Sequence, residues 1–146
     1  MGRHREDLLA MLRPVSTWMD ALPSRPRHLL GIGDLESVEA AMPFGIDSFD
    51  SAYPTRLGRH GTMLVQSDDG SLHRDSIYRA EHRAEHDRAA DPKCKCPSCQ
   101  SYSAAYVHHL HKANEPAGML LTTMHNVYAM TKRMERLRQL ILANEL

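Results

Sequence analysis

The sequence predicts an α/β fold, because a strand, a helix and a second strand follow one another with short connections. The first strand is the apolar run 28–33, which is closed by glycines. The helix begins with an aspartate suited to cap it and extends over about 34–42. The second strand covers about 46–52 and is stopped by a Tyr-Pro pair. This order is typical of a βαβ unit in a parallel sheet.

A helix precedes this unit. Residues 6–22 carry apolar side chains at spacings of three and four, the pattern of an amphipathic helix. Pro14 indicates a kink or a restart within it. The segment Pro-Ser-Arg-Pro at 23–26 ends the helix.

The residue pattern changes after residue 54. Three glycines flank the short apolar stretch 63–65, which indicates a β-hairpin. Residues 73–91 are almost wholly polar, so we expect a solvated segment, either an exposed helix or a mobile insertion. Two further helices are predicted from apolar faces. One face consists of Tyr102, Tyr106, Leu110 and Ala113, and the other, in a helix from about Asn126 to the end, of Val127, Met130, Met134, Leu137 and Ile141.

Composition bounds the function only loosely. The chain of 146 residues has no net charge, and 42% hydrophobic and 25% charged residues are ordinary for a soluble globular domain. Of its 18 cationic residues 14 are arginines, which suit RNA contacts and ion pairs equally well. The sequence has no run of about 18 apolar residues, so we expect no membrane span. Its N-terminal residues, with acids before any apolar stretch, are unlike a secretory signal.

All the cysteines lie in one short segment. The pattern Cys94-x-Cys96-x2-Cys99 is a poor framework for disulfides and a good one for a metal, which also predicts a reducing, cytoplasmic location. With a histidine as fourth ligand, such a site is closed and its zinc is structural. Spacing alone leaves that histidine open. The candidates are His125 and the three histidines on the intervening helix, His108, His109 and His111.

Longer motifs are more specific. The segment 44–56 contains a strand ending in Phe-Asp followed by Pro-Thr-Arg, and a Gly/Arg loop comes next at 58–61. Asp91-Pro92 leads into the cysteines, and Leu-Thr-Thr-Met-His-Asn follows at 121–126. With Pro-Arg-His-Leu-Leu-Gly-Ile-Gly at 26–33, these motifs resemble the tRNA-guanine transglycosylase family in order and spacing, over essentially the whole chain.

The resemblance implies a (β/α)8 TIM barrel with a zinc-binding subdomain inserted near its C-terminal end. Such a barrel needs about 250 residues, so we expect this chain to correspond to the C-terminal part, the last two strands and helices with the subdomain. The expected domains are barrel units at 1–62, the zinc-binding subdomain at 63–125 and a C-terminal helix at 126–146.

The resemblance also implies a reaction, in which guanine at the wobble position of tRNA is exchanged for queuine or a 7-deazaguanine precursor, in queuosine biosynthesis. Asp50 matches the nucleophile, which forms a covalent aspartyl-ribose intermediate; the alternative is a turn aspartate. Leu30 and Gly31 match residues that line the base pocket, although Leu30 in a buried strand is also simply core. Arg56 and Arg59 match positions that hold the tRNA, with surface ion pairing as the alternative.

The resemblance makes His125 the fourth ligand of a structural zinc ion, beside Cys94, Cys96 and Cys99. The expected partners are tRNA and the 7-deazaguanine base, together with a homo-oligomer or a complementing N-terminal half that carries the remaining base-binding residues. We therefore interpret the chain as a piece of the enzyme that is inactive alone. A non-catalytic partner subunit and an independent zinc-containing RNA-binding module are the competing interpretations, and the retained Asp50 argues against the partner subunit.

Overall fold

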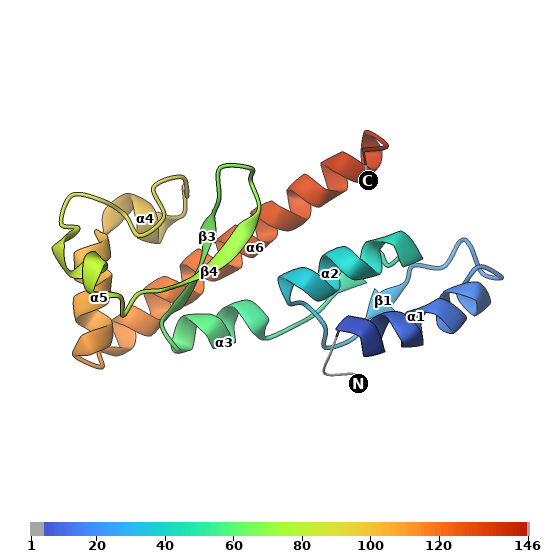
Figure 1. Ribbon diagram of the computed structural model, residues 1–146, viewed down its shortest axis with the longest axis horizontal. Coiled ribbons are helices and arrows are strands. Elements are labelled where there is room, and N and C mark those ends of the chain that lie inside the picture. Colours follow the sequence, from blue (N-terminus) through green and yellow to red (C-terminus); the bar gives the residue numbers. More distant parts are fainter. Residues whose placement is uncertain (1–4, 146) are drawn as a thin grey trace. The chain divides into compact units, whose positions relative to one another are not determined.

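The computed structural model describes residues 5–145, which form two compact units that divide between Tyr53 and Pro54 (Figure 1). The first unit thus ends before residue 62, where the sequence placed the end of the barrel units. The predicted domain boundaries at 62 and 125 stay predictions about the family's architecture.

The first unit contains the predicted strand, helix and strand. Its elements are α1 (Arg5–Met19), β1 (His28–Leu29), α2 (Leu35–Ala41), the 3-10 helix η1 (Met42–Phe44) and β2 (Ser48–Phe49). The two strands are parallel, with His28 opposite Ser48 and Leu29 opposite Phe49. They are much shorter than the predicted ranges 28–33 and 46–52, because the chain turns as soon as it leaves each register pair.

Local signals fix both helices of this unit. The Asp34 carboxylate accepts a hydrogen bond from the Ser37 amide at 3.0 Å, which confirms the predicted cap of α2. Helix α1 continues through Pro14. The predicted apolar face of α1 is only partly buried, since Trp18 is 83% exposed. The core consists of Leu8, Leu12, Leu29, Ala41 and Ile46.

The second unit is built on an antiparallel hairpin and a long helix. Its elements are α3 (Tyr53–Arg59, of which Tyr53 still belongs to the first unit), β3 (Thr62–Gln66), β4 (Leu72–Ser76), the 3-10 helix η2 (Ala80–Ala84), α4 (Pro97–Ser101), α5 (Ala104–Lys112) and α6 (Pro116–Leu142). The hairpin confirms the prediction from the glycines, and it pairs Thr62 with Ser76 and Gln66 with Leu72. The short helices α3 and α4 were not predicted.

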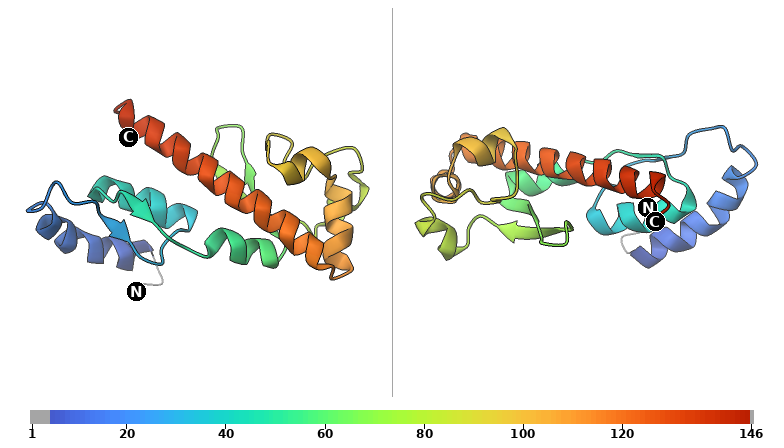
Figure 2. Two further views of the ribbon diagram at one scale, coloured as in Figure 1. Left: turned by 180° about the vertical axis from the view of Figure 1, so that it is seen from behind. Right: turned by 90° about the horizontal axis from the view of Figure 1, so that it is seen from above.

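Helix α6 is the longest element of the described chain, and it begins at Pro116 rather than near Asn126. It packs against β3 and α5, and Figure 2 shows α5 lying across its N-terminal part. The core between these elements consists of Met63, Ile77, Val107, Leu110 and Leu121. Within residues 5–145, none of the helices combines the length and hydropathy that a membrane span requires.

The buried face of α5 differs from the predicted one. Tyr102 and Tyr106 are 41% and 45% exposed and stack on each other, with ring centroids 5.4 Å apart. The helix instead buries two histidines, each with a hydrogen-bond partner. His108 donates from Nδ1 to the Ile77 carbonyl at 2.7 Å, and His111 Nε2 lies 2.7 Å from the Thr122 hydroxyl. A hydrogen-bonded imidazole can replace an apolar side chain at such a position.

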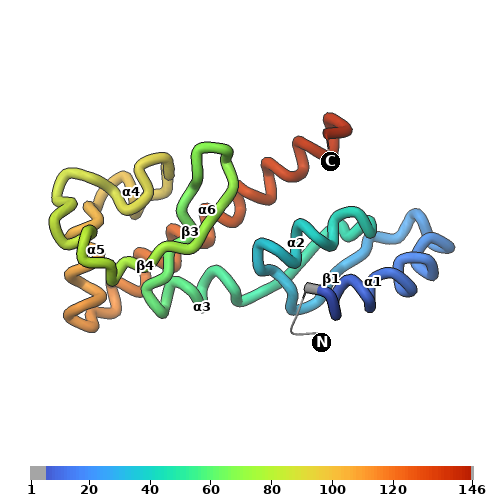
Figure 3. The backbone as a smooth tube through the Cα atoms, viewed as in Figure 1, coloured from blue at the N-terminus to red at the C-terminus, as the bar shows by residue number. Residues whose placement is uncertain are grey.

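The expectation that residues 73–91 are solvated is confirmed only in part, because most of them are exposed but three are buried. The backbone runs from β4 through η2 to the loop before α4 (Figure 3), and it buries Ile77, His82 and Asp91. The ring of His82 lies between two carboxylates, with Nδ1 2.7 Å from Glu85 and Nε2 3.2 Å from Asp75. Polar residues enter the interior here because they satisfy one another.

Asn126 joins α6 to the hairpin and to the start of α3. Its Oδ1 accepts a hydrogen bond from the Leu64 amide at 2.9 Å. Its Nδ2 donates to the carbonyls of Thr62 and Pro54, at 2.8 and 3.1 Å. The side chain is fully buried, so each of these bonds replaces one that water would otherwise make.

We expect Asn126→Ala to lower the free energy of unfolding by about 2–4 kcal/mol, because it leaves buried backbone groups without partners. Urea denaturation followed by circular dichroism measures this loss. Gln139→Ala, at an exposed position of the same helix, is the control and should change the stability by less than about 0.5 kcal/mol. Equal stabilities of the two variants would contradict the role given to Asn126.

Candidate metal centre and carboxylate site

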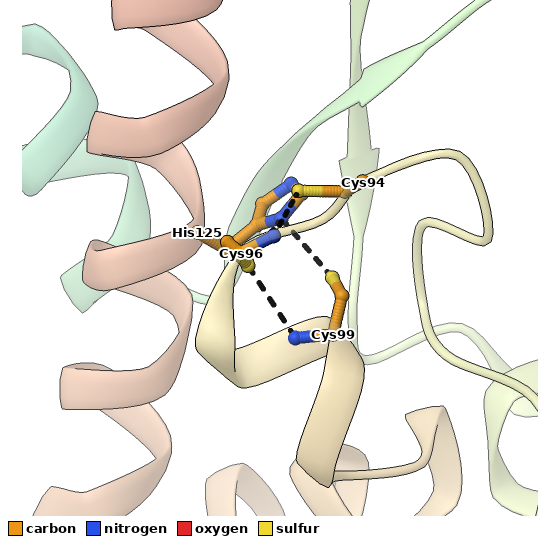
Figure 4. A group of neighbouring side chains, drawn as sticks. All are labelled: Cys94, Cys96, Cys99 and His125. Carbon is orange, nitrogen blue, oxygen red and sulfur yellow. Dashed lines mark hydrogen bonds between the residues drawn. The ribbon is translucent and has the colours of Figure 1, made fainter.

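Three cysteines and one histidine meet in the second unit. The potential ligand atoms of Cys94, Cys96, Cys99 and His125 all lie within 4.8 Å of one another. Figure 4 shows the cysteines coming from the loop and first turn of α4, and His125 reaching them from α6. The His125 Nδ1 atom is 3.3 Å from the Cys99 sulfur and 3.7 Å from the Cys96 sulfur.

The loop before α4 is shaped by its own backbone amides. The Cys96 amide donates to the Cys94 sulfur, and the Cys99 amide donates to the Cys96 sulfur, both at 3.4 Å. Cys96 is thereby the N-cap of α4. Asp91, which is buried, starts the turn by accepting from the Lys93 amide at 3.0 Å and from the Gln66 amide at 3.2 Å. These hydrogen bonds fold the segment with the three cysteines into one tight turn.

A strand carbonyl fixes the orientation of His125. Its Nε2 donates to the Leu64 carbonyl at 3.0 Å, so the proton of the neutral imidazole lies on Nε2. Nδ1 then faces the sulfurs, where it carries either a proton or a bound cation. A hydrogen bond from the second ring nitrogen to a carbonyl is the usual support of a metal-binding histidine.

The donor set fits a tetrahedral zinc ion. With Zn–S bonds of about 2.3 Å and Zn–N bonds of about 2.0 Å, sulfur and nitrogen ligands lie about 3.5 Å apart. The two S···N distances at His125, 3.3 and 3.7 Å, lie on either side of this value. Four protein donors complete the coordination, so an ion held here supports the fold and has no open position for a substrate.

The electrostatics of the cluster also favour a cation. Hydrogen bonds from Cys94 and Cys99 lower the pKa of Cys96 and favour its thiolate. Hydrogen bonding to Cys94 and Cys96 raises the pKa of the Cys99 thiol, because adjacent negative charges repel. Burial alone would lower the pKa of His125, but hydrogen bonds to Cys94 and Cys96 raise it to about 10. The cluster therefore draws positive charge to its centre, which a divalent cation supplies.

The tertiary structure decides which histidine joins the cysteines. His108 and His111 are buried against other partners, His109 is exposed, and only His125 belongs to the Cys3His group found among the described residues. Spacing could not make this choice, because the packing of α6 against β3 and α4 brings His125 to the cysteines.

The second candidate group lies in the first unit, at the ends of the parallel strands. Asp50 directly follows β2, and Gly31 lies just beyond β1. The Gly31 amide donates to Asp50 Oδ1 at 3.1 Å, and His28 Nε2 lies 2.9 Å from the same oxygen. Phe49 packs against the core, whereas the Asp50 side chain is 56% exposed, as the alternation of a strand predicts.

Glycine geometry allows this arrangement. Gly31 has a positive φ of 72°, a conformation that favours glycine and that turns its amide toward Asp50. Gly33 lies so close to Ser51 that a Cβ atom would meet the serine Cβ at 2.4 Å. The glycines that closed the predicted strand therefore serve to bring the ends of β1 and β2 together.

The surroundings of Asp50 favour its charged form. The hydrogen bond from the Gly31 amide, followed by the one from His28, lowers the pKa of the Asp50 carboxyl. Both donors stabilise the carboxylate, so the group stays ionised at neutral pH and gains a proton only in more acidic solution. An exposed, ionised carboxylate with fixed donors is suited to act as a nucleophile.

The remaining predicted residues are all accessible. Leu30 is 64% exposed, so the alternative of a core leucine is wrong. Arg56 and Arg59 lie exposed on α3, and no residue in the described part of the chain forms an ion pair with either. The sequence analysis assigned no role to His28. The one signal for it was the register, since His28, Ser48 and Asp50 alternate with the buried Leu29 and the half-buried Phe49.

Comparison with known proteins decides the family. The family model described as Queuine tRNA-ribosyltransferase matches residues 1–146. The chain belongs to the queuine tRNA-ribosyltransferase family. It is 43% identical over 142 residues to the queuine tRNA-ribosyltransferase of Protochlamydia amoebophila, covering 97% of this chain and 34% of that protein. It is 39% identical over 147 residues to that of Chlamydia muridarum, covering 100% of this chain and 37% of that protein.

The chain spans about a third of the length of these curated relatives, 34% and 37%. It corresponds to the C-terminal part of the queuine tRNA-ribosyltransferases, as the motifs predicted. Its mixed α/β structure and its Cys3His cluster agree with that family.

We expect Cys96→Ser to lower the zinc content of the purified chain and to lower its Tm by about 5 °C or more. Cys96 is fully buried and contacts both a neighbouring cysteine and His125, so a weaker ligand there loses metal and folding energy together. Elemental analysis and thermal denaturation measure the two effects. Ser101→Ala, exposed at the end of the same helix, is the control. A variant with full zinc content and an unchanged melt would contradict the Cys3His assignment.

Proposed function

We propose that this chain carries the nucleophile and the zinc-binding part of a tRNA-guanine transglycosylase. The enzyme exchanges guanine at the wobble position of tRNA for queuine or a 7-deazaguanine precursor. The observation that carries the proposal is Asp50, an exposed and ionised carboxylate that two N–H groups hold at the C-terminal ends of two parallel strands. The active sites of α/β barrels gather at this end of the strands.

The reaction follows from a carboxylate nucleophile. An Asp50 oxygen attacks C1′ of the ribose and forms a covalent aspartyl-ribose ester while guanine departs with the electrons of the glycosidic bond. The incoming base then attacks C1′ and releases the carboxylate. Two displacements at one carbon retain its configuration, as in retaining glycosidases. The departing guanine gains a proton and the incoming base loses one, so the exchange is balanced.

Other residues of the chain support this reaction. Leu30 and Gly31 line the pocket of the base beside the nucleophile, and the exposure of Leu30 suits an apolar contact with a purine. Arg56 and Arg59 hold the tRNA backbone through its phosphates. The Cys3His cluster holds structural zinc through Cys94, Cys96, Cys99 and His125. The remaining base-recognition groups belong to an N-terminal part of the enzyme or to a partner chain, in a homo-oligomeric assembly in the cytoplasm.

The competing candidate is a zinc-containing module that binds tRNA without catalysis. The observation in its favour is that the Cys3His cluster and the exposed Arg56 and Arg59 belong to the second compact unit, whereas Asp50 belongs to the first. Two strands cannot close a barrel, and a ribose must be fixed in line with the carboxylate before attack. We therefore expect the chain alone to be inactive in exchange.

We expect Asp50→Asn to abolish exchange, by about 1,000-fold or more, and to prevent formation of a covalent tRNA adduct. The test uses a chimera in which this chain replaces the matching segment of the Protochlamydia amoebophila relative. Labelled-guanine exchange is measured for the chain alone, for the chimera and for its Asn variant. Asp47→Asn, an exposed aspartate that directly precedes β2, is the control. Turnover by the isolated chain, or full exchange by the Asn variant, would overturn these roles.

We expect Arg56→Ala with Arg59→Ala to weaken tRNA binding and to reduce the salt dependence of log Kd by about one to two units of slope. Both side chains are exposed, so the melt should not change. Binding of the chimera to tRNA is measured over a range of salt concentrations. The control removes two other exposed arginines, Arg83 and Arg138. If the two double variants bind alike, the proposed RNA contacts are wrong.

A further inference from the structure

His28 stands between two polar groups at the edge of the parallel strands. Its Nδ1 lies 2.9 Å from the Ser48 hydroxyl, and its Nε2 lies 2.9 Å from Asp50 Oδ1. The side chain is 44% exposed, and it is not part of the hydrophobic core. A surface histidine with both ring nitrogens engaged is held in one orientation by polar contacts alone.

The ring's hydrogen bonds assign its proton. An ionised carboxylate only accepts, so Nε2 carries the hydrogen that reaches Asp50. Nδ1 then accepts from the Ser48 hydroxyl when the ring is neutral. When the ring is protonated, the same hydroxyl rotates and accepts from Nδ1. Ser48 thus keeps the ring in place in both states, and Asp50 keeps its donor.

Both donors bind the same carboxylate oxygen. Within residues 5–145, the hydrogen bonds to the Asp50 side chain, from the Gly31 amide and from His28, end on Oδ1. Two donors on one oxygen fix the plane and the direction of the carboxylate. The second oxygen, Oδ2, is left as the atom that can approach an electrophile.

We propose that His28 is a positioning residue for the transglycosylase reaction. Oriented by Ser48, it acts with the Gly31 amide to hold Oδ1 and to present Oδ2 to C1′ of the ribose. This inference rests on the proposed function of Asp50.

The arrangement fits each step of the exchange. In the first step Oδ2 bonds to C1′ as the bond from C1′ to guanine breaks, and Oδ1 becomes the carbonyl oxygen of the ester. In the second step the incoming base bonds to C1′ and the electron pair returns to Oδ2. Oδ1 keeps its two N–H donors throughout, so His28 orients the group and stabilises the departing carboxylate without giving up a proton.

Three substitutions separate orientation from structure. His28→Gln keeps one N–H donor near the position of Nε2, and His28→Leu removes the donor while keeping an apolar stem of similar size. Ser48→Ala leaves the imidazole but removes the hydroxyl that orients it. Since His28 and Ser48 are exposed, we expect all three variants to fold and melt like the unchanged chain.

The first measurement does not depend on activity. The Asp50 carboxyl carbon is titrated by NMR in the full zinc-loaded chain. We expect the pKa of Asp50 to rise in His28→Leu and to rise less in His28→Gln, because the carboxylate loses a donor in the first and keeps one in the second. An Asp50 titration in His28→Leu that matches the unchanged chain would overturn the inference.

The second measurement uses the chimera described above. We expect His28→Leu to lower kcat for guanine exchange by ~10- to 100-fold, with a change in KM for tRNA below about twofold. His28→Gln should recover most of that loss, and Ser48→Ala should lie between them. A kcat of His28→Leu equal to that of the unchanged chimera would overturn the inference alone. Failure of the unchanged chimera to exchange guanine would overturn the proposed function as well.

Discussion

The backbone of one residue, Leu64, connects the long helix to the hairpin, and the metal cluster depends on it. Two consecutive side chains of α6 bind this residue: His125 donates to its carbonyl, and Asn126 accepts from its amide. Neither backbone group takes part in the pairing of β3 with β4. Side chains of α6 therefore satisfy the edge of β3 that faces away from β4. The hydrogen bond from His125 Nε2 to the Leu64 carbonyl also orients the ring so that Nδ1 faces the cysteines. The four potential ligands therefore come together only when α6 packs against the hairpin.

This coupling explains how a small domain holds so many polar groups inside. The second unit buries His82, Asp91, His108, His111, His125 and Asn126 beside its apolar core. Within the described residues, no buried side-chain nitrogen or oxygen lacks a hydrogen-bond partner. A buried polar group that is satisfied specifies one arrangement, whereas an unsatisfied one is costly. The unit therefore relies on directional bonds, and a bound ion adds to them.

The Asp50 carboxylate of the first unit is also held by directional hydrogen bonds. Asp50 is exposed, yet the amide of Gly31 and the ring of His28 fix one of its oxygens. The metal cluster and the carboxylate belong to different compact units. Because the four cluster donors leave a tetrahedral ion no open position, an ion bound there would act by stabilising the unit that holds it.

The sequence by itself determined the features that neighbouring residues control. The Asp34 cap, the βαβ order, the hairpin and the clustering of three cysteines all depend on groups a few residues apart, and all four are present. Family motifs also led to Asp50 and to His125, whose roles stay proposals. Periodicity failed where polar residues are buried in pairs, as at His82 and along α5, because hydropathy assigns such residues to the surface.

Only the tertiary structure decided which distant groups meet. It brought His125 to the cysteines in preference to three histidines nearer in sequence, and it extended α6 back to Pro116. It also placed His28 against Asp50 through the register of two short strands. For His125 and His28 the reason is the same: these contacts join residues about twenty or more positions apart, and hydrogen bonds that close such loops form only when the packing of other elements has brought the chain together.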